Sequence, residues 1–184
     1  ERLRDPNKPV GLLVNNAGFG TGKDVVDDDP ERLEQEVRLN CLAVVGLTAR
    51  YLPAMRERRG GTIINVSSAA AFQPMPHMAV YGATKAFVLS FTEALWRETR
   101  KDGIRVLAVC PGSTDTPFFE VSDEGTVVGR MRSTRQVLDT TMRALRTSRP
   151  SVVDGLGNAV VARFITRVLP KRALLAAVDR GFRH

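Results

Sequence analysis

With 184 residues, of which 43% are hydrophobic and 26% charged, the chain has the size and composition of one globular domain. No apolar run reaches the roughly 18 residues of a membrane span, so no membrane-spanning segment is expected within these residues. Lys and Arg outnumber Asp and Glu by 27 to 20, but no aromatic residues interleave with the cations, so no nucleic-acid partner is expected.

Strand and helix signals alternate along the first half of the chain. A short apolar run at residues 10–14, followed by an Asn-Asn-Ala-Gly turn, predicts a fully buried strand. A loop rich in Gly and Asp over 19–30 leads to Pro30, after which apolar residues at helical spacing predict a long helix over 31–58. The β-branched run at 62–66 predicts a second strand.

The same alternation continues in the second half. Helical spacing over 80–101 is followed by an apolar run at 104–109, a third strand that a Pro-Gly pair ends. Residues 134–146 show an amphipathic helical pattern, 151–153 a last short strand, and a helical tail with a proline break follows. Helices between parallel strands predict an α/β fold, a doubly wound parallel sheet with helices on both faces, within a single domain over 1–184.

The cysteines indicate a reducing compartment and no disulfide scaffold. Only Cys41 and Cys110 are present, one in a predicted helix and one at a strand end, without the spacing of a metal site. We therefore expect a cytoplasmic protein without a bound metal, in which both cysteines are small buried side chains.

One predicted helix carries a pair of side chains suited to proton transfer. Tyr81 and Lys85 are four residues apart, so the phenol and the ammonium lie on one face of the helix. A free tyrosine titrates near pH ~10, and a nearby cation lowers that pKa, which makes the pair a candidate general acid and base. The spacing alone is weak, because a chance surface pair is easily met in a chain with 27 basic residues.

Two serines lie where this helix can meet a substrate. An Asn-Val-Ser-Ser run closes the second predicted strand, so Ser67 and Ser68 emerge at the carboxyl end of the sheet, where open α/β sheets bind ligands. Ser68, Tyr81 and Lys85 can then converge on one substrate oxygen. Taken alone, both serines would be turn residues or helix caps.

Together with three further motifs, these residues resemble the short-chain dehydrogenase/reductase family. Each motif is weak by itself, but five occur in the family's order and at its spacings: Asn15-Asn16-Ala17-Gly18, Asn40, Ser68, Tyr81-x-x-x-Lys85 and Pro111-Gly112-x-x-x-Thr116. The resemblance implies a Rossmann-like sheet and an NAD(P)-dependent oxidoreductase that interconverts a secondary alcohol and a ketone.

The resemblance implies a role for each matching catalytic residue. Tyr81 would exchange a proton with the substrate oxygen, Lys85 would bind the nicotinamide ribose and lower the pKa of Tyr81, and Ser68 would orient the carbonyl. Asn40 would hold a water of the proton relay, the alternative being a buried amide that satisfies backbone groups. A hydride would move between the nicotinamide and the carbonyl carbon, and the cofactor supplies that chemistry.

The resemblance also implies which residues surround the cofactor. Asn16 and its neighbours would line the adenosine side and tie the central strands together, and the segment after the third strand would shape the nicotinamide pocket. The expected cofactor is NAD(P), with a slight preference for NADP. The implied cofactor-binding set is Asn16, Ala17, Gly18, Tyr81, Lys85, Pro111, Gly112, Thr114 and Thr116.

The chain departs from the family at its beginning. Family members open with a strand and a Gly-rich turn that cradles the pyrophosphate, and nothing of this kind precedes Val10. The Gly-x-Gly-x-Gly run at 18–22 follows the first motif and does not replace that turn. We therefore expect a truncated chain that lacks its first βαβ units, on the order of 70 residues, and is inactive alone.

Two segments outside the motifs are expected to contact substrate or a membrane. Residues 113–133 would form a substrate lid, with apolar contacts from Phe118, Phe119 and Val121. The positive excess is concentrated in the tail 158–184, which looks like that of hydroxysteroid and long-chain 3-oxoacyl reductases. This implies a lipid-like substrate and a nearby membrane surface. A solvated helix face, a cover over the pocket or a dimer interface explains the tail equally well.

Interpretations of other classes stay open. A non-catalytic relative would keep the fold as a binding or regulatory module, although the complete catalytic set argues against it, and a peripheral membrane protein is a third interpretation. The long helices over 31–58 and 80–101 resemble the pair that forms dimer bundles in the family, so a homodimer or homotetramer is expected. His77, in the loop before Tyr81, is expected to be exposed.

Overall fold

The computed structural model describes residues 9–116, 118 and 131–182. Their strands form one parallel sheet in chain order, so all of them end at the same edge. The register places Val14 opposite Ile64. The strands are β1 (Leu12–Asn15), β2 (Gly61–Val66), β3 (Ile104–Cys110) and β4 (Ser151–Val153).

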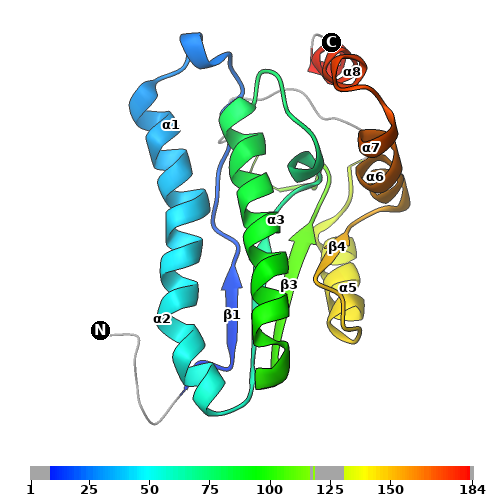
Figure 1. The fold of residues 1–184 in the computed structure, drawn as a ribbon. Helices are drawn as coiled ribbons and strands as arrows, with labels where there is room; N and C mark the ends of the chain where they lie inside the picture. Colours follow the sequence, from blue (N-terminus) through cyan, green and yellow to red (C-terminus); the bar gives the residue numbers. More distant parts are fainter. Residues whose placement is uncertain (1–8, 117, 119–130, 183–184) are drawn as a thin grey trace.

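Two long helical segments cover one face of the sheet (Figure 1). The first begins with α1 (Pro30–Val37), whose N-terminus is capped by the Asp29 side chain, and contains a π-helical turn, η2 (Arg38–Leu42). It continues as α2 (Ala43–Glu57). The second is α3 (Ala79–Thr99), which runs antiparallel to the strands and brings its first turn to their carboxyl edge.

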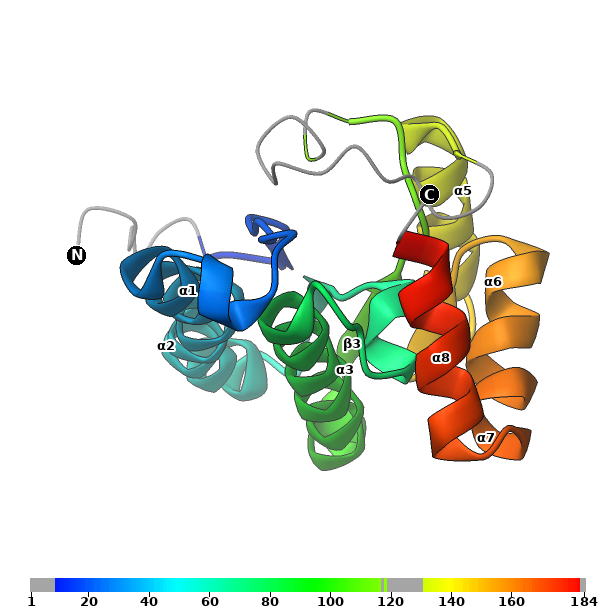
Figure 2. The same cartoon turned by 90° about the horizontal axis from the view of Figure 1, so that it is seen from above.

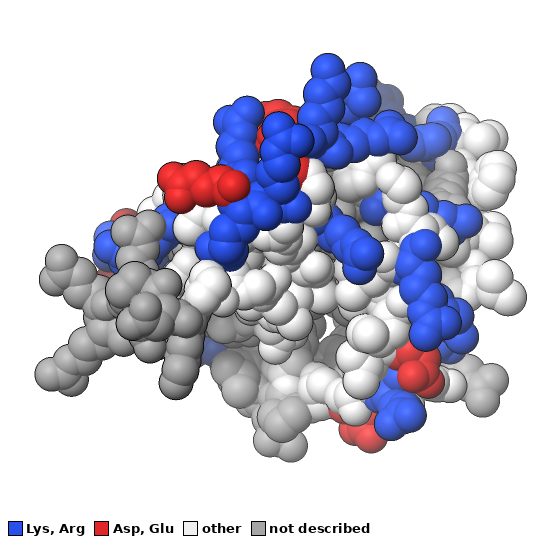
Figure 3. Space-filling view, turned by 90° about the horizontal axis from the view of Figure 1, so that it is seen from below, with Lys and Arg blue, Asp and Glu red and all other residues white. Residues whose placement is uncertain are grey.

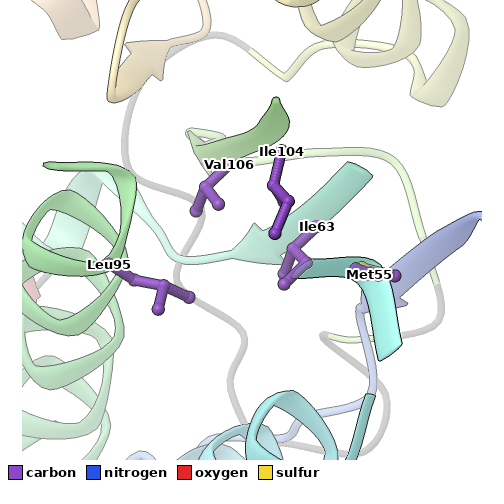
Figure 4. Packing of buried hydrophobic residues seen from close by; sticks show 5 residues of the cluster. All are labelled: Met55, Ile63, Leu95, Ile104 and Val106. Atoms are coloured by element: carbon purple, nitrogen blue, oxygen red, sulfur yellow. The ribbon is translucent and has the colours of Figure 1, made fainter. Parts of the chain in front are cut away.

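A dry cluster joins these helices to the sheet. Met55 of α2 and Leu95 of α3 pack on Ile63, Ile104 and Val106, and all five side chains are at most 6% exposed (Figure 4). Burying each such side chain contributes about 1.5–3 kcal/mol. This cluster lies near the amino ends of the strands, and it fixes the far end of α3 while the near end carries Tyr81.

The opposite face is covered by α5 (Thr134–Leu145), whose Ala144 packs on Ile64, Leu107 and Val109. Because neighbouring residues of a strand point to opposite faces, α5 lies across the sheet from α2 and α3 (Figure 2). The strands nevertheless follow one another in a single direction. The crossover from β3 to β4 therefore has the opposite hand to the two before it, an arrangement that is rare among parallel strands.

The tail is helical and breaks at a proline, as expected. The segments α6 (Leu156–Val160), η5 (Val161–Ile165) and α7 (Thr166–Val168) are followed by an extended residue, and then by α8 (Lys171–Phe182). Within the described residues, no helix combines the length and the apolarity needed to cross a bilayer.

The prediction of a fully buried first strand is wrong. Leu12 is 54% exposed and Val14 is 48% exposed. Strand β1 lies at the edge of the described sheet, and α5 covers the strands at the other edge, so no helix of the described residues lies against one face of β1. The other predicted strands and helices agree with the observed bounds to within about two residues.

Positive charge is not concentrated in the tail alone. Among the described residues, the helix ends, turns and strand starts at the amino edge of the sheet carry ten Lys and Arg but only the carboxylates of Glu57, Glu98 and Asp102 (Figure 3). The cations are Arg56, Arg58, Arg59, Arg97, Arg100, Lys101, Arg105, Arg143, Arg146 and Arg149. We call this the basic end. Three helices finish there, and cations at helix C-termini offset the helix dipole, which accounts for part of the excess. Hollows of about 110 and 450 Å³ also open there, far from Tyr81.

Candidate active site

The carboxyl edge of the sheet gathers most of the predicted site residues. Ser67 and Ser68 follow β2, and Pro111 follows β3. The Ser67 amide donates to the Val109 carbonyl oxygen at 2.7 Å, and the Ala69 amide donates to that of Pro111 at 2.7 Å. The two strand ends thereby hold Ser68 at a fixed place on this edge.

Lys85 is buried at the centre of the site. Its side chain is only 5% exposed, and its Nζ donates to the Val66 carbonyl oxygen at 3.1 Å. The same Nζ lies 5.6 Å from the centre of the Tyr81 ring. Burial lowers the pKa of Lys85 from 10.5 to about 8, against the opposing effects of Cys41, Glu36 and Cys110. The ammonium form is therefore still the main one at neutral pH.

The Tyr81 ring lies on the first turns of α3, where two neighbours contact it. The Phe118 ring centre is 5.5 Å away. Gly20 also approaches the ring: a Cβ added there would lie 2.9 Å from Cδ2 of Tyr81, so only glycine permits this approach. The ring and the Lys85 ammonium are thus fixed relative to each other.

The two serines divide their contacts. The Ser67 hydroxyl donates to the Lys85 carbonyl oxygen at 2.7 Å, which ties the end of β2 to α3. The Ser68 Oγ accepts from the Ala70 amide at 3.1 Å and caps a short 3-10 helix, η3 (Ala69–Phe72). Ser68 is therefore the helix cap that was expected, and in this cap its hydroxyl acts only as a hydrogen-bond acceptor. The Ser68 O–H can still donate to a substrate oxygen.

Asn40 is a buried amide bonded to backbone, which is the alternative that the sequence left open. Its Oδ1 accepts from the Phe19 amide at 3.2 Å, and its Nδ2 donates to the Phe19 carbonyl oxygen at 2.8 Å. The same Nδ2 donates to Oγ1 of Thr84, the neighbour of Lys85, at 3.1 Å. Asn40 thereby fastens the turn after β1 to α3, and its water-holding role stays a prediction.

The residue whose side chain ties β1 to β2 is Asn15 and not Asn16. The Asn15 Nδ2 donates to Oδ1 of Asn65 at 2.8 Å, and the Asn65 Nδ2 donates to Oγ1 of Thr92 at 2.9 Å. Asn16 and Ala17 are exposed at the carboxyl edge, where they are open to a ligand, and Gly18 is half-buried. Asn15 makes this bond because its side chain lies on the buried face of the strand, and the side chain of the next residue must point to the opposite side.

The segment after β3 is held by its own backbone. Thr114 Oγ1 donates to the Gly112 carbonyl oxygen at 3.0 Å, and Thr116 Oγ1 donates to that of Thr114 at 3.3 Å. Both hydroxyls therefore have partners within the turn. Much of the predicted lid 113–133, with Phe119 and Val121, lies outside the described residues.

Sequence reasoning missed an ion pair that anchors this segment. Arg132 binds Asp154 through both guanidinium Nε and Nη2, and Thr140 donates to Oδ1 of Asp154 at 2.6 Å. Asp154 is fully buried, and backbone bonds join Arg132 to Ser113 and Asp115. No local spacing signals a pair 22 residues apart. Glu36, also missed and also fully buried, lies four residues before Asn40, and that spacing was a usable signal.

His77 is not the exposed loop histidine that was expected. Its side chain is 28% exposed, and its Nδ1 and Nε2 lie 2.8 Å from Asp24 and from Asp179 of α8. Hydrogen bonds that the imidazolium donates to the Asp179 carboxylate and then to that of Asp24 raise the pKa of His77. The imidazole therefore joins two segments distant in sequence, which no local pattern could predict.

Both cysteines are buried, as predicted. Cys41 is 7% exposed and Cys110 is inaccessible. Burial raises the pKa of the Cys41 thiol and raises that of Cys110 to about 12. Neither thiol is activated as a nucleophile, because a thiolate is the reactive form.

Comparison with known proteins decides the family. The profile of the short chain dehydrogenase family matches residues 1–126, which include Asn40, Ser68, Tyr81 and Lys85. The chain belongs to the short-chain dehydrogenase family. Its fold and family membership agree with the expectations from sequence.

Individual members of the short-chain dehydrogenase family cover much of the chain. A very-long-chain 3-oxoacyl-CoA reductase of Anas platyrhynchos is 36% identical over 61% of this chain and 38% of its own. A Burkholderia cenocepacia short chain dehydrogenase in complex with NADP has a TM-score of 0.78 at 30% identity, over 91% of this chain and 70% of that one. A Brucella melitensis 3-ketoacyl-(acyl-carrier-protein) reductase complexed with NADH has a TM-score of 0.70 at 28% identity, over 79% and 65%. The chain spans about half the length or less of the first curated relatives.

Proposed function

We propose that the whole protein is an NAD(P)-dependent oxidoreductase that interconverts a secondary alcohol and a ketone, with Tyr81 as general acid and base. The observation that carries the proposal is the buried Lys85 ammonium, 5.6 Å from the Tyr81 ring. A cation so close in a poorly solvated site favours the phenolate. Membership of the short-chain dehydrogenase family supports the same oxidoreductase chemistry.

The donors at the carboxyl edge fit a nicotinamide cofactor. Lys85 Nζ has three N–H donors and uses one for Val66, so donors remain for ribose hydroxyls. Asn16 and Ala17 are exposed directly after β1, at the same edge of the sheet. NAD(P) supplies or accepts the hydride when it is bound. Solved relatives bind NADP or NADH, and a slight preference for NADP stays part of the proposal.

The residues of this chain then handle the proton. In the reducing direction, the Ser68 O–H donates a hydrogen bond to the substrate carbonyl oxygen and orients it. Tyr81 gives its phenolic proton to that oxygen as the carbonyl carbon receives the hydride, and the Lys85 ammonium stabilises the phenolate left behind. In the oxidising direction, the Tyr81 phenolate removes the hydroxyl proton. The similarity to a very-long-chain 3-oxoacyl-CoA reductase supports a lipid-like substrate.

Replacing the phenol tests the assignment in the full-length protein. Tyr81→Phe should lower kcat by about 10²–10⁴, the usual contribution of a general acid or base, and should leave cofactor affinity nearly unchanged. Tyr51→Phe is the matched control, because Tyr51 lies on α2, away from the site. Turnover of Tyr81→Phe near that of Tyr51→Phe would show that another group moves the proton.

We propose that the protein forms a homodimer or homotetramer through α2 and α3. Leu47 and Phe87 on these helices, with Leu42 before α2, are 39–63% exposed apolar side chains. Covering such side chains is favourable at about 25 cal/mol per Å². Sedimentation velocity of the full-length protein checks the assembly, and a monomer at micromolar concentration would contradict it.

A second proposed property is binding to an anionic membrane surface through the tail. Leu156, Phe164 and Val168 are 89%, 65% and 79% exposed, and they share the tail with Arg167 and Lys171. Apolar side chains beside cations suit the interface of an anionic bilayer. Cosedimentation with phosphatidylcholine vesicles, with and without phosphatidylserine, measures the binding.

Two variants separate the tail from the basic end in that assay. Phe164→Ser with Val168→Ser should lower binding to anionic vesicles several-fold, whereas Arg146→Ser with Arg149→Ser should leave it nearly unchanged, because the proposal places the basic end away from the vesicle. The reverse order would mean that the basic end binds the vesicle and the tail does not.

A further inference from the structure

A fully buried carboxylate lies next to the proposed catalytic residues and has no role in the mechanism above. Glu36 of α1 is 0% exposed, although an acidic residue is almost never fully buried without a partner. Its Oε2 accepts from the Thr21 hydroxyl at 2.9 Å. Its Oε1 has no hydrogen-bond partner among the described residues. The carboxylate is thus only partly hydrogen-bonded. Its burial costs folding free energy, and a role in the site would explain why it is there.

One turn of chain covers both this carboxylate and Lys85. At one end of the turn, a Cβ added to Gly18 would lie 2.8 Å from Oδ1 of Asn40 and 3.4 Å from Nζ of Lys85. At the other end, Thr21 donates to Glu36. Glu36 and Asn40 are four residues apart on one helical segment, so they lie on one face of it. Glu36 and Lys85 therefore belong to one enclosed polar cluster.

The charges within this cluster influence one another. The groups that act on Glu36 are Lys85 from α3, Asp28 from the loop before α1 and Thr21 from the turn, and Cys41 of η2 lies near both Glu36 and Lys85. Burial and the Asp28 carboxylate raise the pKa of Glu36 from 4.5 to about 7, while Lys85 opposes the rise. Glu36 in turn opposes the lowered pKa of Lys85. Each group opposes the shift in the other's pKa, so their titrations are coupled.

We propose that Glu36 is the buried counter-charge of Lys85, and that it keeps the ammonium protonated and so sets the pH at which Tyr81 gives up its proton. This rests on the proposed function of Tyr81 and Lys85. Glu36 contacts neither substrate nor cofactor, so it is a positioning residue that acts through Lys85. An ionised Glu36 favours the ammonium, the ammonium favours the Tyr81 phenolate, and the phenolate is the base that alcohol oxidation requires.

The pH dependence of alcohol oxidation by the full-length protein tests the proposal. Glu36→Gln keeps the shape of the side chain and removes its charge. Above about pH 7, where Glu36 is ionised, the variant should turn over several-fold more slowly, so the apparent pKa of the acidic limb of kcat moves up. At lower pH Glu36 is protonated in the unaltered protein as well, so the two profiles should converge, while cofactor affinity changes little. Glu34→Gln is the matched control, because Glu34 lies on the same helix in an exposed pair with Arg38 and should leave the profile unchanged.

A second variant keeps the carboxylate in place and guards against loss of folding. Thr21→Val removes the hydrogen bond that favours the ionised form of Glu36, so the acidic limb should move in the same direction by a smaller amount. Profiles of Glu36→Gln and Thr21→Val that superimpose on the unaltered protein would overturn the inference, even if Tyr81→Phe is inactive. Activity in Tyr81→Phe would instead overturn the proposed function, and this inference with it.

Discussion

At the scale of single residues, the site depends on how closely backbone approaches buried side chains. The turn after β1 lies against Asn40 and Lys85 at Gly18, and against Tyr81 at Gly20. A side chain at either position would displace the groups that proton transfer needs. The two glycines are therefore required for the geometry of the site, as the phenol and the ammonium are required for proton transfer.

Gly18→Ala is expected to damage the site from the backbone side. The new Cβ would lie 2.8 Å from Oδ1 of Asn40, so the amide and then Lys85 must shift. Overpacking of this kind costs about 1–3 kcal/mol, and a displaced Lys85 should lower kcat/KM at least tenfold. Thermal unfolding and steady-state kinetics measure both effects.

The matched control for this change is Gly46→Ala on α2. Nothing lies within 4 Å of the Cβ that it would add, and alanine is the better helix former by up to about 1 kcal/mol. It should therefore leave activity unchanged and stabilise slightly. Equal behaviour of the two variants would mean that Gly18 tolerates a side chain.

At the scale of elements, the last helix is attached by a histidine rather than by a large apolar contact. His77 bridges Asp24 and Asp179, and its backbone has a φ of 65°, in the left-handed region that few residues adopt. Of the residues of α8, only Leu174 is buried. An ionic bridge is thus a main attachment of α8, and its strength depends on protonation.

The attachment of α8 should weaken as the pH rises. The folded pKa of His77 is raised above the unfolded value of 6.5, so its stabilising contribution is complete below pH 6.5 and is lost as the pH passes the raised pKa. Hydrogen exchange of α8 amides, corrected for the intrinsic effect of pH, should show easier opening above neutrality. His77→Gln should remove most of that pH dependence, and an unchanged profile in this variant would contradict the role of the bridge.

At the scale of the whole molecule, burial of Glu36 makes stability depend on pH in the unusual direction for a carboxylate. The folded pKa of about 7 lies above the unfolded 4.5, so the folded state holds a proton that the unfolded chain releases between these values. The free energy of unfolding should therefore fall as the pH rises through this window, by up to ~3 kcal/mol. Glu36→Gln should flatten the fall in urea unfolding at pH 5 and pH 8, and a fall of equal size in the variant would assign it to other groups.

How far the sequence predicts this molecule depends on the range of the interactions. Strands and helices follow from periodicity, and the catalytic set from short motifs at the ends of strands, because both are local. The pairs Arg132–Asp154 and His77–Asp179 join segments far apart, so no spacing reveals them. The hand of the third crossover was unpredictable for another reason: the general rule for parallel strands gives the opposite answer. Asn15 was passed over for Asn16 because the register of one residue decides which side chain points into the sheet.

The exposed strand at the sheet's edge has a consequence for handling the protein. In the part of the chain that the structure describes, no strand pairs with the outer edge of β1, and the side chains of Leu12 and Val14 are exposed there. Such a strand is a template on which a second molecule can add a strand of its own, the first step of amyloid-like growth. Residues 9–182 expressed alone should therefore precipitate in a concentration-dependent way, and a lysine in place of Val14 should keep them in solution.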